Sequence, residues 1–235
     1  MSNIKDVAAL AGVSVTTVSR VLNKRGYISK EVYAKVYDAM EQLDYQPNQI
    51  ARSLYSQKTN CVGVLIPDVS HPFFAEIVKR IEGELNQQGY RIFLCNAVGD
   101  GVREQEYLSM LRQNKVDGII IATHMLETSL YESLDLPIVA LDLELGESIP
   151  TVCADHEKGG RLAAQELIRS GCRCVLNVGG NMDVKTPSIR RYRACEAMLR
   201  EAGVDCINAC LEQEFNRQTY QVEIERLLRQ YPQAD

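Results

Sequence analysis

The feature that most constrains the fold is the alternation of short apolar runs with amphipathic segments from residue 61 onward. The pattern predicts strands near residues 61–67, 91–96, 117–123 and 137–143, with helices near residues 73–88, 102–114 and 126–134. A second run begins near Thr151, with strands expected around 151–154, 174–179 and 206–211 and helices around 157–170, 189–202 and 217–230. Because strands that alternate with helices pair in parallel, we expect two α/β halves.

Length and composition agree with a globular protein of two domains. The chain has 235 residues, of which 46% are hydrophobic and 24% charged. No apolar stretch is long enough to span a bilayer, and the N-terminal residues MSNIKDVAAL lack a basic segment followed by an apolar one. We therefore expect a cytoplasmic protein with no membrane partner.

The cysteines favour no metal or redox site. They are Cys61, Cys95, Cys153, Cys172, Cys174, Cys195, Cys206 and Cys210. No CxxC pair and no Cys/His quartet has the spacing of a zinc site, so we expect buried free thiols. The sequence predicts neither a metal nor a cofactor.

Charge is distributed unequally along the chain. Residues 1–60 contain eight Lys and Arg against five Asp and Glu, whereas residues 61–235 contain eighteen against twenty-six. A basic N-terminal part followed by an acidic remainder suits a chain whose N-terminal part binds a polyanion. Many charged protein surfaces, however, only contact solvent.

The first part of the chain has the pattern of two short helices joined by a tight turn. Asn3 can cap the first helix and Gly12 can end it, and Ser14 can cap the second. The second helix directs Thr16, Thr17, Ser19 and Arg20 outward. Such a pair is typical of a helix-turn-helix. Pairs of helices rich in Ala, Val and Thr also occur, however, where the helices only pack on each other and bind no DNA.

A third helix and a short fourth segment follow. Ser29 can cap the third helix, and Val32, Val36, Met40 and Leu43 give it an apolar face that would close a three-helix core. After Pro47, the residues QIARSLYS predict a short helix with little apolar surface. Such a segment could fold against a partner, with Leu54 entering a DNA minor groove, or it could be an ordinary linker.

These segments resemble the lactose/galactose repressor family of bacterial transcription regulators. The resemblance is carried by IKDVAALAGVS at 4–14, TTVSRVLN at 16–23 and YQPNQIARSL at 45–54, in the order and spacing of the family, and it continues through the body. It implies three parts: a helix-turn-helix head at 1–46, a hinge at 47–59 and an effector-binding domain at 60–235.

The resemblance also implies how operator DNA would be bound. Val15, Thr16 and Arg20 would face base edges in the major groove, and Arg20 could bind guanine through two hydrogen bonds. Thr17, Ser19 and Asn23 would contact phosphates. In this family the hinge helices of two subunits pair in the minor groove. Leu54 would intercalate there, and Ala51 would allow close approach in a homodimer or tetramer.

For residues 60–235 the resemblance implies a fold like the periplasmic sugar-binding proteins, with two parallel-sheet lobes and an effector between them. The expected effector contacts are Phe73, Phe74, Asp142, Lys185, Thr186 and Arg191. Each has a structural alternative: the phenylalanines could be core, the aspartate a helix cap, and the arginine part of a solvated basic face.

Several stretches look most like the sucrose-operon repressors of Gram-positive bacteria, among them GYISKEV at 26–32 and PIVALD at 137–142. Sucrose or a phosphorylated sugar derived from it is the first expected effector, since Lys185 and the RRYR run would suit a phosphate. Another sugar or a purine is the alternative. Because relatives continue beyond the point that matches Asp235, we expect an incomplete second lobe, truncated at the C-terminus.

Two other classes of function agree less well with the sequence than a repressor does. A sugar-binding protein without DNA function is opposed by the head and by the lack of a signal-peptide pattern. An enzyme is opposed by the lack of a GxGxxG, P-loop or GxSxG motif, and by three histidines, His71, His124 and His156, without an evident nucleophile partner. The sequence therefore predicts a repressor and no enzyme.

Overall fold

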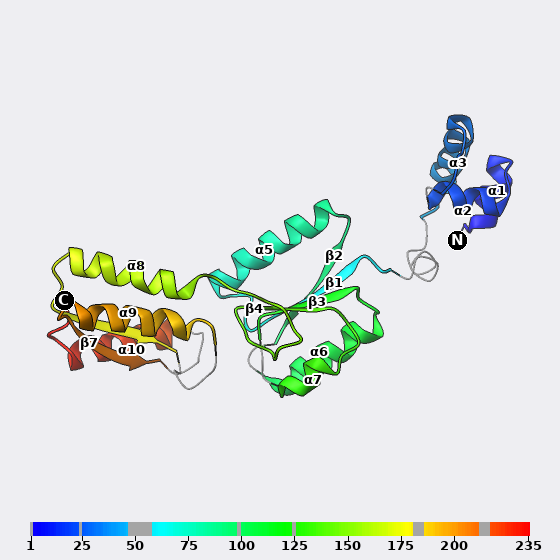
Figure 1. Cartoon of the computed structure of the whole chain (residues 1–235). Coiled ribbons are helices and arrows are strands. Elements are labelled where there is room, and N and C mark those ends of the chain that lie inside the picture. Colours follow the sequence, from blue (N-terminus) through cyan, green and yellow to red (C-terminus); the bar gives the residue numbers. More distant parts are fainter. Residues whose placement is uncertain are drawn as a thin grey trace. The chain divides into compact units, whose positions relative to one another are not determined.

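The computed structural model of the chain describes residues 2–23, 25–46, 58–97, 100–123, 126–180, 186–211 and 217–235, with the side chains of 217–219 left out. The chain divides into two compact units, Met1–Thr59 and Asn60–Asp235. The helical unit is blue in Figure 1, and the α/β unit runs from cyan to red.

The helical unit begins with two short helices, α1 (Ile4–Ala11) and α2 (Val15–Leu22). The Asn3 side chain accepts hydrogen bonds from the backbone N–H groups at the start of α1, and Asp6 completes the capping box by accepting from the Asn3 backbone. Gly12 ends α1 in the left-handed region with φ 64°, which a residue without Cβ adopts at no steric cost. The Ser14 hydroxyl then caps α2.

A third helix, α3 (Lys30–Gln42), closes the core of this unit and is capped by Ser29. Val7, Val18, Val21 and Val36 are fully buried in it. They come from all three helices, so α1 and α2 are held by α3 as well as by their shared turn. The expected helix-turn-helix with a third supporting helix is confirmed.

The first lobe of the second unit is a parallel sheet with the strand order β2-β1-β3-β4-β5. Its strands are β1 (Cys61–Ile66), β2 (Arg91–Asn96), β3 (Gly118–Ile121), β4 (Ile138–Leu141) and β5 (Thr151–Val152). The connecting helices are α5 (Pro72–Gln87), α6 (Gly101–Gln113) and α7 (Thr128–Glu132). Helix α5 covers one face of this sheet, and α6 and α7 cover the other (Figure 1).

Alternating side chains of the central strands feed two apolar clusters, one on each face. Leu65 of β1 packs with Leu111 of α6 and Tyr131 of α7, whereas its neighbours Val64 and Ile66 pack with Val78 of α5. Because both faces of a parallel sheet are buried, β1 is apolar without interruption. The functional polar groups are therefore confined to the strand ends.

The predicted position of one strand needs correction. The sequence pattern assigned the strand near Thr151 to the second half, but β5 pairs in parallel with β4 and belongs to the first sheet. The segment between these strands carries Leu143, Leu145 and Ile149, which are buried in the core of the first lobe. Burial of this segment holds the following strand in the first sheet.

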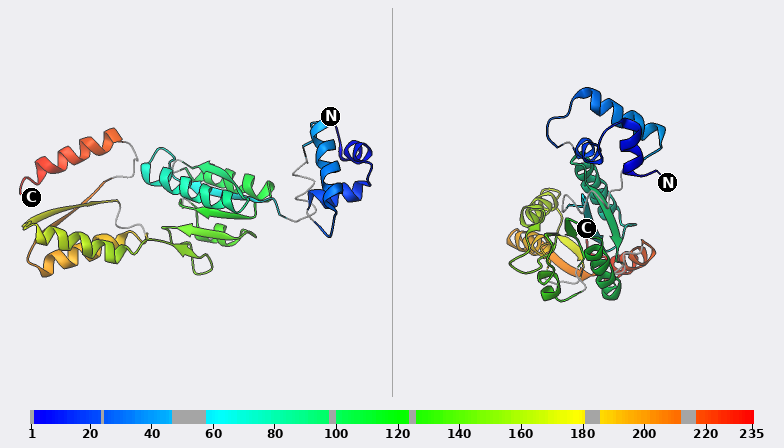
Figure 2. Two further views of the ribbon diagram at one scale, coloured as in Figure 1. Left: turned by 90° about the horizontal axis from the view of Figure 1, so that it is seen from above. Right: turned by 90° about the vertical axis from the view of Figure 1, so that its right-hand side faces the viewer.

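The second lobe contains α8 (His156–Arg169), β6 (Cys174–Gly179), α9 (Ile189–Glu201), β7 (Asp205–Cys210) and α10 (Arg217–Gln230). Strands β6 and β7 pair in parallel from Cys174–Asp205 to Gly179–Cys210. Helices α8 and α9 lie on one side of this pair and α10 on the other (Figures 1 and 2). Ala164 of α8 and Leu199 of α9 are fully buried in one apolar cluster with Val175 of β6.

The cysteines only partly match the expectation of buried thiols. Cys95, Cys174 and Cys195 are buried, and burial raises the pKa of the Cys95 thiol to about 11. Cys153 and Cys210 are exposed, so the expectation is wrong for these two; both lie at or just beyond a strand end, where core packing stops. Within the described ranges, no cluster of His, Cys, Asp or Glu could hold a metal ion.

No helix among the described residues combines the length and the apolar character needed to cross a membrane.

The close approach of α8 and α9 gives a stability prediction. A Cβ on Gly160 would lie well inside van der Waals contact of the Arg191 backbone carbonyl oxygen, whereas a Cβ on Gly159 would meet nothing within 4 Å. We expect Gly160→Ala to lower the free energy of unfolding by about 1–3 kcal/mol through overpacking. The matched change Gly159→Ala should raise it by about 0.5–1 kcal/mol, because alanine favours the helix.

Urea unfolding of the α/β unit, followed by circular dichroism, measures both changes. Equal effects of the two substitutions on the midpoint would contradict the close packing of α8 on α9.

Candidate functional site

The exposed face of α2 presents side chains suited to nucleic-acid recognition. Val15 is 39% exposed, and Thr16 and Arg20 are also exposed, so the structure brings these three predicted residues to the surface of one helix. Arg20 has no ion-pair partner in the part of the chain that the structure describes, so its guanidinium keeps its donors for a ligand.

The three predicted phosphate contacts lie deeper and bond to their neighbours. The Thr17 and Ser14 hydroxyls are 2.9 Å apart, and the Asn23 amide donates to the Ser19 carbonyl oxygen at 2.9 Å. Thr17, Ser19 and Asn23 are all half-buried. Contact of these three side chains with DNA phosphates, which we expect from the sequence, stays a prediction. Ala51 and Leu54 lie outside the described residues.

An aromatic group lies at the carboxyl end of β1. His71 caps α5, its Nδ1 accepting from the Phe73 backbone N–H at 3.3 Å, and the Phe73 and Phe74 ring centroids are 5.1 Å apart. Phe73 is 49% exposed, whereas Phe74 is half-buried and packs on the cluster beneath α5. Phe73 thus has a free ring surface for a ligand, and Phe74 supports it as part of the core.

The turn before this group is held by Asp68. Its carboxylate accepts hydrogen bonds from the Ser70 backbone N–H and hydroxyl, which lower its pKa. The Val69 backbone N–H donates to the Asn96 side chain at 3.0 Å, which ties the end of β1 to the end of β2. The loop that carries the aromatic group is therefore fixed at both strands.

A buried carboxylate fixes the end of β3. Glu104 of α6 is fully buried and accepts hydrogen bonds from the Tyr131 hydroxyl and, at 3.1 Å, from the Thr123 hydroxyl. The Tyr131 hydroxyl in turn accepts from the Leu126 backbone N–H at 3.2 Å. This network was not predicted from the sequence, because nothing in the spacing of 104, 123 and 131 shows that they meet.

The end of β4 carries Asp142, which pairs with a histidine from the second lobe. Asp142 Oδ1 lies 2.5 Å from Nε2 of His156, the first residue of α8. Asp142 adopts φ 56°, a left-handed conformation that aspartate tolerates better than most residues with a side chain. This contact assigns the predicted strand-end aspartate to the junction of the lobes and gives His156 a partner.

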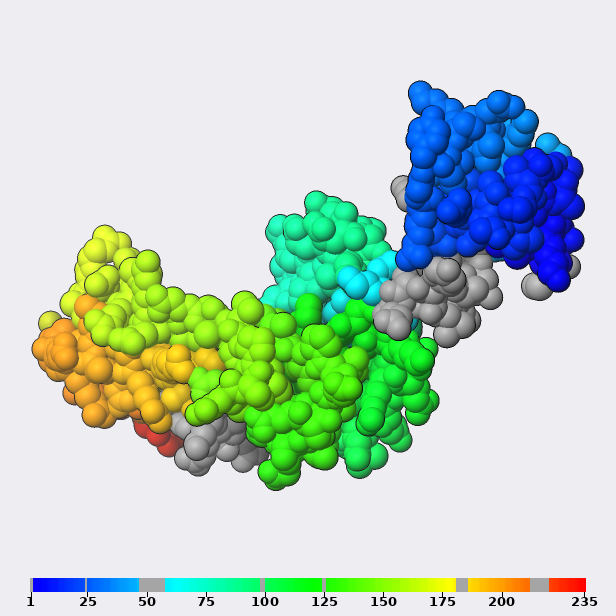
Figure 3. Space-filling model, turned by 45° about the vertical axis from the view of Figure 1, so that its right-hand side comes forward, coloured from blue at the N-terminus to red at the C-terminus, as the bar shows by residue number. Residues whose placement is uncertain are grey.

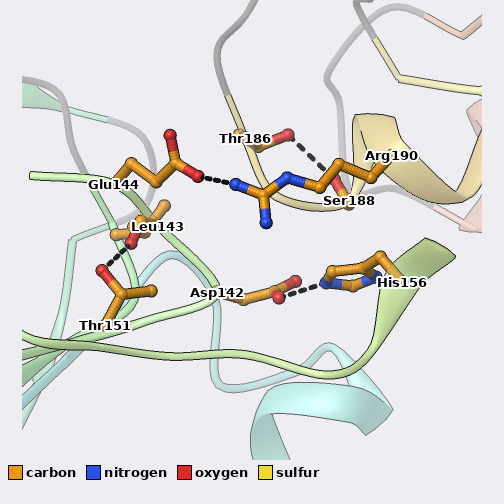
Figure 4. Close-up of polar contacts among 8 residues, drawn as sticks. All are labelled: Asp142, Leu143, Glu144, Thr151, His156, Thr186, Ser188 and Arg190. Atoms are coloured by element: carbon orange, nitrogen blue, oxygen red, sulfur yellow. Dashed lines mark hydrogen bonds and ion pairs between the residues drawn. The ribbon is translucent and has the colours of Figure 1, made fainter.

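A second ionic contact lies two residues further on. The Glu144 carboxylate accepts a hydrogen bond from the Arg190 guanidinium of α9, and Figure 4 shows this pair beside the Asp142–His156 pair. In the same view the Thr186 and Ser188 hydroxyls bond to each other at 2.8 Å just before α9. Thr186 therefore lies beside the ionic contact, as part of the same surface.

Arg191, the predicted effector contact, and its neighbour Arg190 have different surroundings. Arg191 is exposed, and its guanidinium lies over the Tyr192 ring at 5.5 Å from the centroid, while Arg190 reaches the other lobe. Arg190 could not be distinguished from Arg191 in the sequence, because both residues stand in one basic run and only their positions on α9 separate them. Lys185 lies outside the described residues.

Carboxylates, a guanidinium, hydroxyls and an aromatic ring thus gather where strands of one parallel sheet end and the second lobe begins. The surface is hollowed between the α5 and α8 segments, teal and yellow-green in Figure 3. Carboxylates accept hydrogen bonds from hydroxyl groups, the guanidinium donates them, and the ring can stack on an apolar face. The arrangement suits a ligand with several hydroxyl groups, at the usual position for ligands of open parallel sheets.

Two family matches cover nearly the whole chain. The family described as periplasmic binding proteins and sugar binding domain of LacI family matches residues 59–235. The family described as bacterial regulatory proteins, lacI family, matches residues 3–48.

Similar proteins include named regulators. A ribose operon repressor of Halalkalibacterium halodurans is 40% identical over 100% of this chain and 70% of its own length. A sucrose operon repressor of Pediococcus pentosaceus is 44% identical over 83% of this chain and 60% of its own length. The chain therefore spans between 60% and 70% of the length of these two relatives.

Among solved structures, a lac repressor dimer bound to operator and an anti-inducer has a similar fold. It superposes with a TM-score of 0.80 at 24% identity, over 97% of this chain and 70% of that one. The sugar-binding-domain family matches residues 59–235, which is more than half of the chain, and this match shows the family to which the chain belongs. The chain belongs to the LacI family of bacterial regulatory proteins, with a helix-turn-helix region followed by an α/β periplasmic-binding-type domain.

Proposed function

We propose that the protein is a DNA-binding repressor of a sugar-utilisation operon, released from its operator when a sugar or sugar phosphate binds to the α/β unit. One observation carries the proposal. A single chain combines an α2 face with an unpaired, exposed Arg20 and a second unit whose strand ends suit a polyhydroxyl ligand. The similar ribose and sucrose operon repressors support the same conclusion.

The proposed DNA contacts follow the sequence analysis. In a homodimer, two heads, each formed by residues 1–46, bind a near-palindromic operator, with Val15, Thr16 and Arg20 at base edges and Thr17, Ser19 and Asn23 at phosphates. Residues 47–59 form the hinge, in which Ala51 and Leu54 contact the minor groove.

Sucrose is the first effector to test, and ribose stands beside it because relatives named for both sugars have similar identity. Phe73, Asp142 and Thr186 are proposed contacts. Arg190, through its position opposite Glu144, is supported more strongly than Arg191. Another sugar or a purine is the alternative effector.

Release requires that the effector bind the two states of the protein with different affinity, because equal affinity shifts no population. Asp142 and Glu144 of the first lobe contact His156 and Arg190 of the second. A ligand that replaces or strengthens these contacts changes how the lobes are held. We propose that this change is transmitted to DNA binding and that the protein has no enzymatic activity.

Fluorescence anisotropy of the intact gene product, titrated against the upstream DNA of its own operon, tests the proposal. Selective binding that is released by sucrose, ribose or one of their phosphates would support it. Selective binding that responds to none of them would keep the repressor and reject these effectors, and the absence of selective binding would reject the repressor.

Arg20→Ala is the test of the α2 face. Loss of a bidentate contact to guanine should weaken operator binding by roughly 10- to 100-fold, corresponding to about 1–3 kcal/mol. Arg25→Ala, in the segment that follows α2, is the control for removal of one positive charge from the same unit. Equal losses in the two variants, measured by anisotropy at one salt concentration, would indicate a purely electrostatic role for Arg20.

Neighbouring arginines of α9 provide a second test. Arg190→Ala should retain operator affinity but lose release by the effector, because it removes the side chain that faces Glu144. Arg191→Ala, the matched control, should be released as the natural protein is, since its guanidinium lies over Tyr192. The measurement is the sugar concentration that gives half-release, and the opposite pattern would assign the effector contact to Arg191.

A further inference from the structure

We propose that Glu144 makes the effector site selective for uncharged sugars, so that the effector is a neutral polyhydroxyl compound and not a sugar phosphate. The inference rests on the proposed function, because it concerns the effector of the same site. It names a residue that determines specificity and the chemical class that the residue accepts.

The first observation is the pairing of Arg190. Protein sites for phosphate commonly use the guanidinium fork of arginine, which matches two oxygens of the anion. Here one terminal nitrogen of the Arg190 guanidinium donates to the Glu144 carboxylate, so a carboxylate already lies where an anion would bind. The side chains of Arg190 and Glu144 are 60% and 49% exposed, so both charges are reachable by a ligand.

The second observation is the carboxylate next to this pair. Asp142 lies two residues before Glu144 on the same segment and is itself paired with His156, whose side chain is only 5% exposed. Figure 4 shows the arrangement: the first lobe contributes two acidic side chains here, and the second contributes Arg190 and His156. His156 is charged only when protonated, so among the described residues Arg190 is the one permanent cation that forms an ion pair with either carboxylate.

The charges of this cluster favour a ligand without charge. Hydroxyl groups of a neutral sugar can donate to Glu144 and Asp142 and accept from Arg190, so the ion pairs need not separate. A phosphate dianion bound to Arg190 would lie beside the Glu144 carboxylate, with Asp142 two residues away on the same segment. Like charges at such short range repel, and a repulsive element of this kind excludes a competing ligand even when the rest of the ligand fits.

The magnitude follows from the exposure of the pair. Solvent screens the repulsion between charges on exposed side chains. Because Glu144 is half-exposed, we expect its repulsion to weaken phosphate binding by about tenfold.

Isothermal titration calorimetry of the intact gene product tests the inference, with ribose, ribose 5-phosphate, sucrose and sucrose 6-phosphate as probes. The variants are Glu144→Gln, which keeps the shape and removes the charge, and the control Glu147→Gln, an exposed glutamate on the same segment with no ion pair in the described part of the chain. Circular dichroism of both variants checks that they are folded.

We expect the natural protein to bind a neutral sugar at least tenfold more tightly than its phosphate. Glu144→Gln should reduce this preference about tenfold by improving phosphate binding, and Glu147→Gln should leave it as in the natural protein. Tighter binding of a phosphate by the natural protein, or a preference that Glu144→Gln leaves unchanged, would overturn the inference.

Operator binding measured on the same preparations separates the two proposals. Selective operator binding together with a preference for a sugar phosphate would overturn the selectivity of Glu144 and leave the repressor standing. A preference for the neutral sugar in a protein without selective operator binding would reject the repressor and support the role of Glu144.

Discussion

Burial of the first parallel sheet on both faces is the constraint on which the α/β unit depends. Leu65 and Val64, adjacent on β1, enter two different apolar clusters, so helices must cover both sides of the sheet. Polar side chains that could contact a ligand are therefore expected at the strand ends and not on the two buried faces of the sheet. The His71–Phe74 group, Thr123 and Asp142 all follow the carboxyl ends of strands in this sheet.

That edge is also the place where the second lobe makes contact. Asp142 with His156 and Glu144 with Arg190 join residues that follow β4 to the beginnings of α8 and α9. The Glu104 network serves the same edge from within, because it fixes Thr123 after β3 without exposing its carboxylate. The ligand that we propose at this edge would therefore meet side chains that are held from both lobes.

The helical unit depends on a different and smaller core. Four buried valines from three helices hold α2 in place, and the capping side chains of Asn3, Ser14 and Ser29 satisfy helix ends that the small core cannot protect. The exposed face of α2 consequently contributes little to the core. Its polar side chains and its arginine are available for a partner.

Much of this organisation follows from sequence alone. Capping residues, the left-handed Gly12 turn and the periodicity of apolar residues are local signals, so the described helices of the head and the described strands and helices of the body were predicted. The position of β5, the Glu104–Tyr131 network, the exposure of Cys153 and Cys210, and the pairing of Glu144 with Arg190 were decided only by the tertiary structure. The physical reason is that local sequence determines helix, strand and turn, whereas partners distant in the chain meet only when the sheet is assembled and its strand ends are brought together.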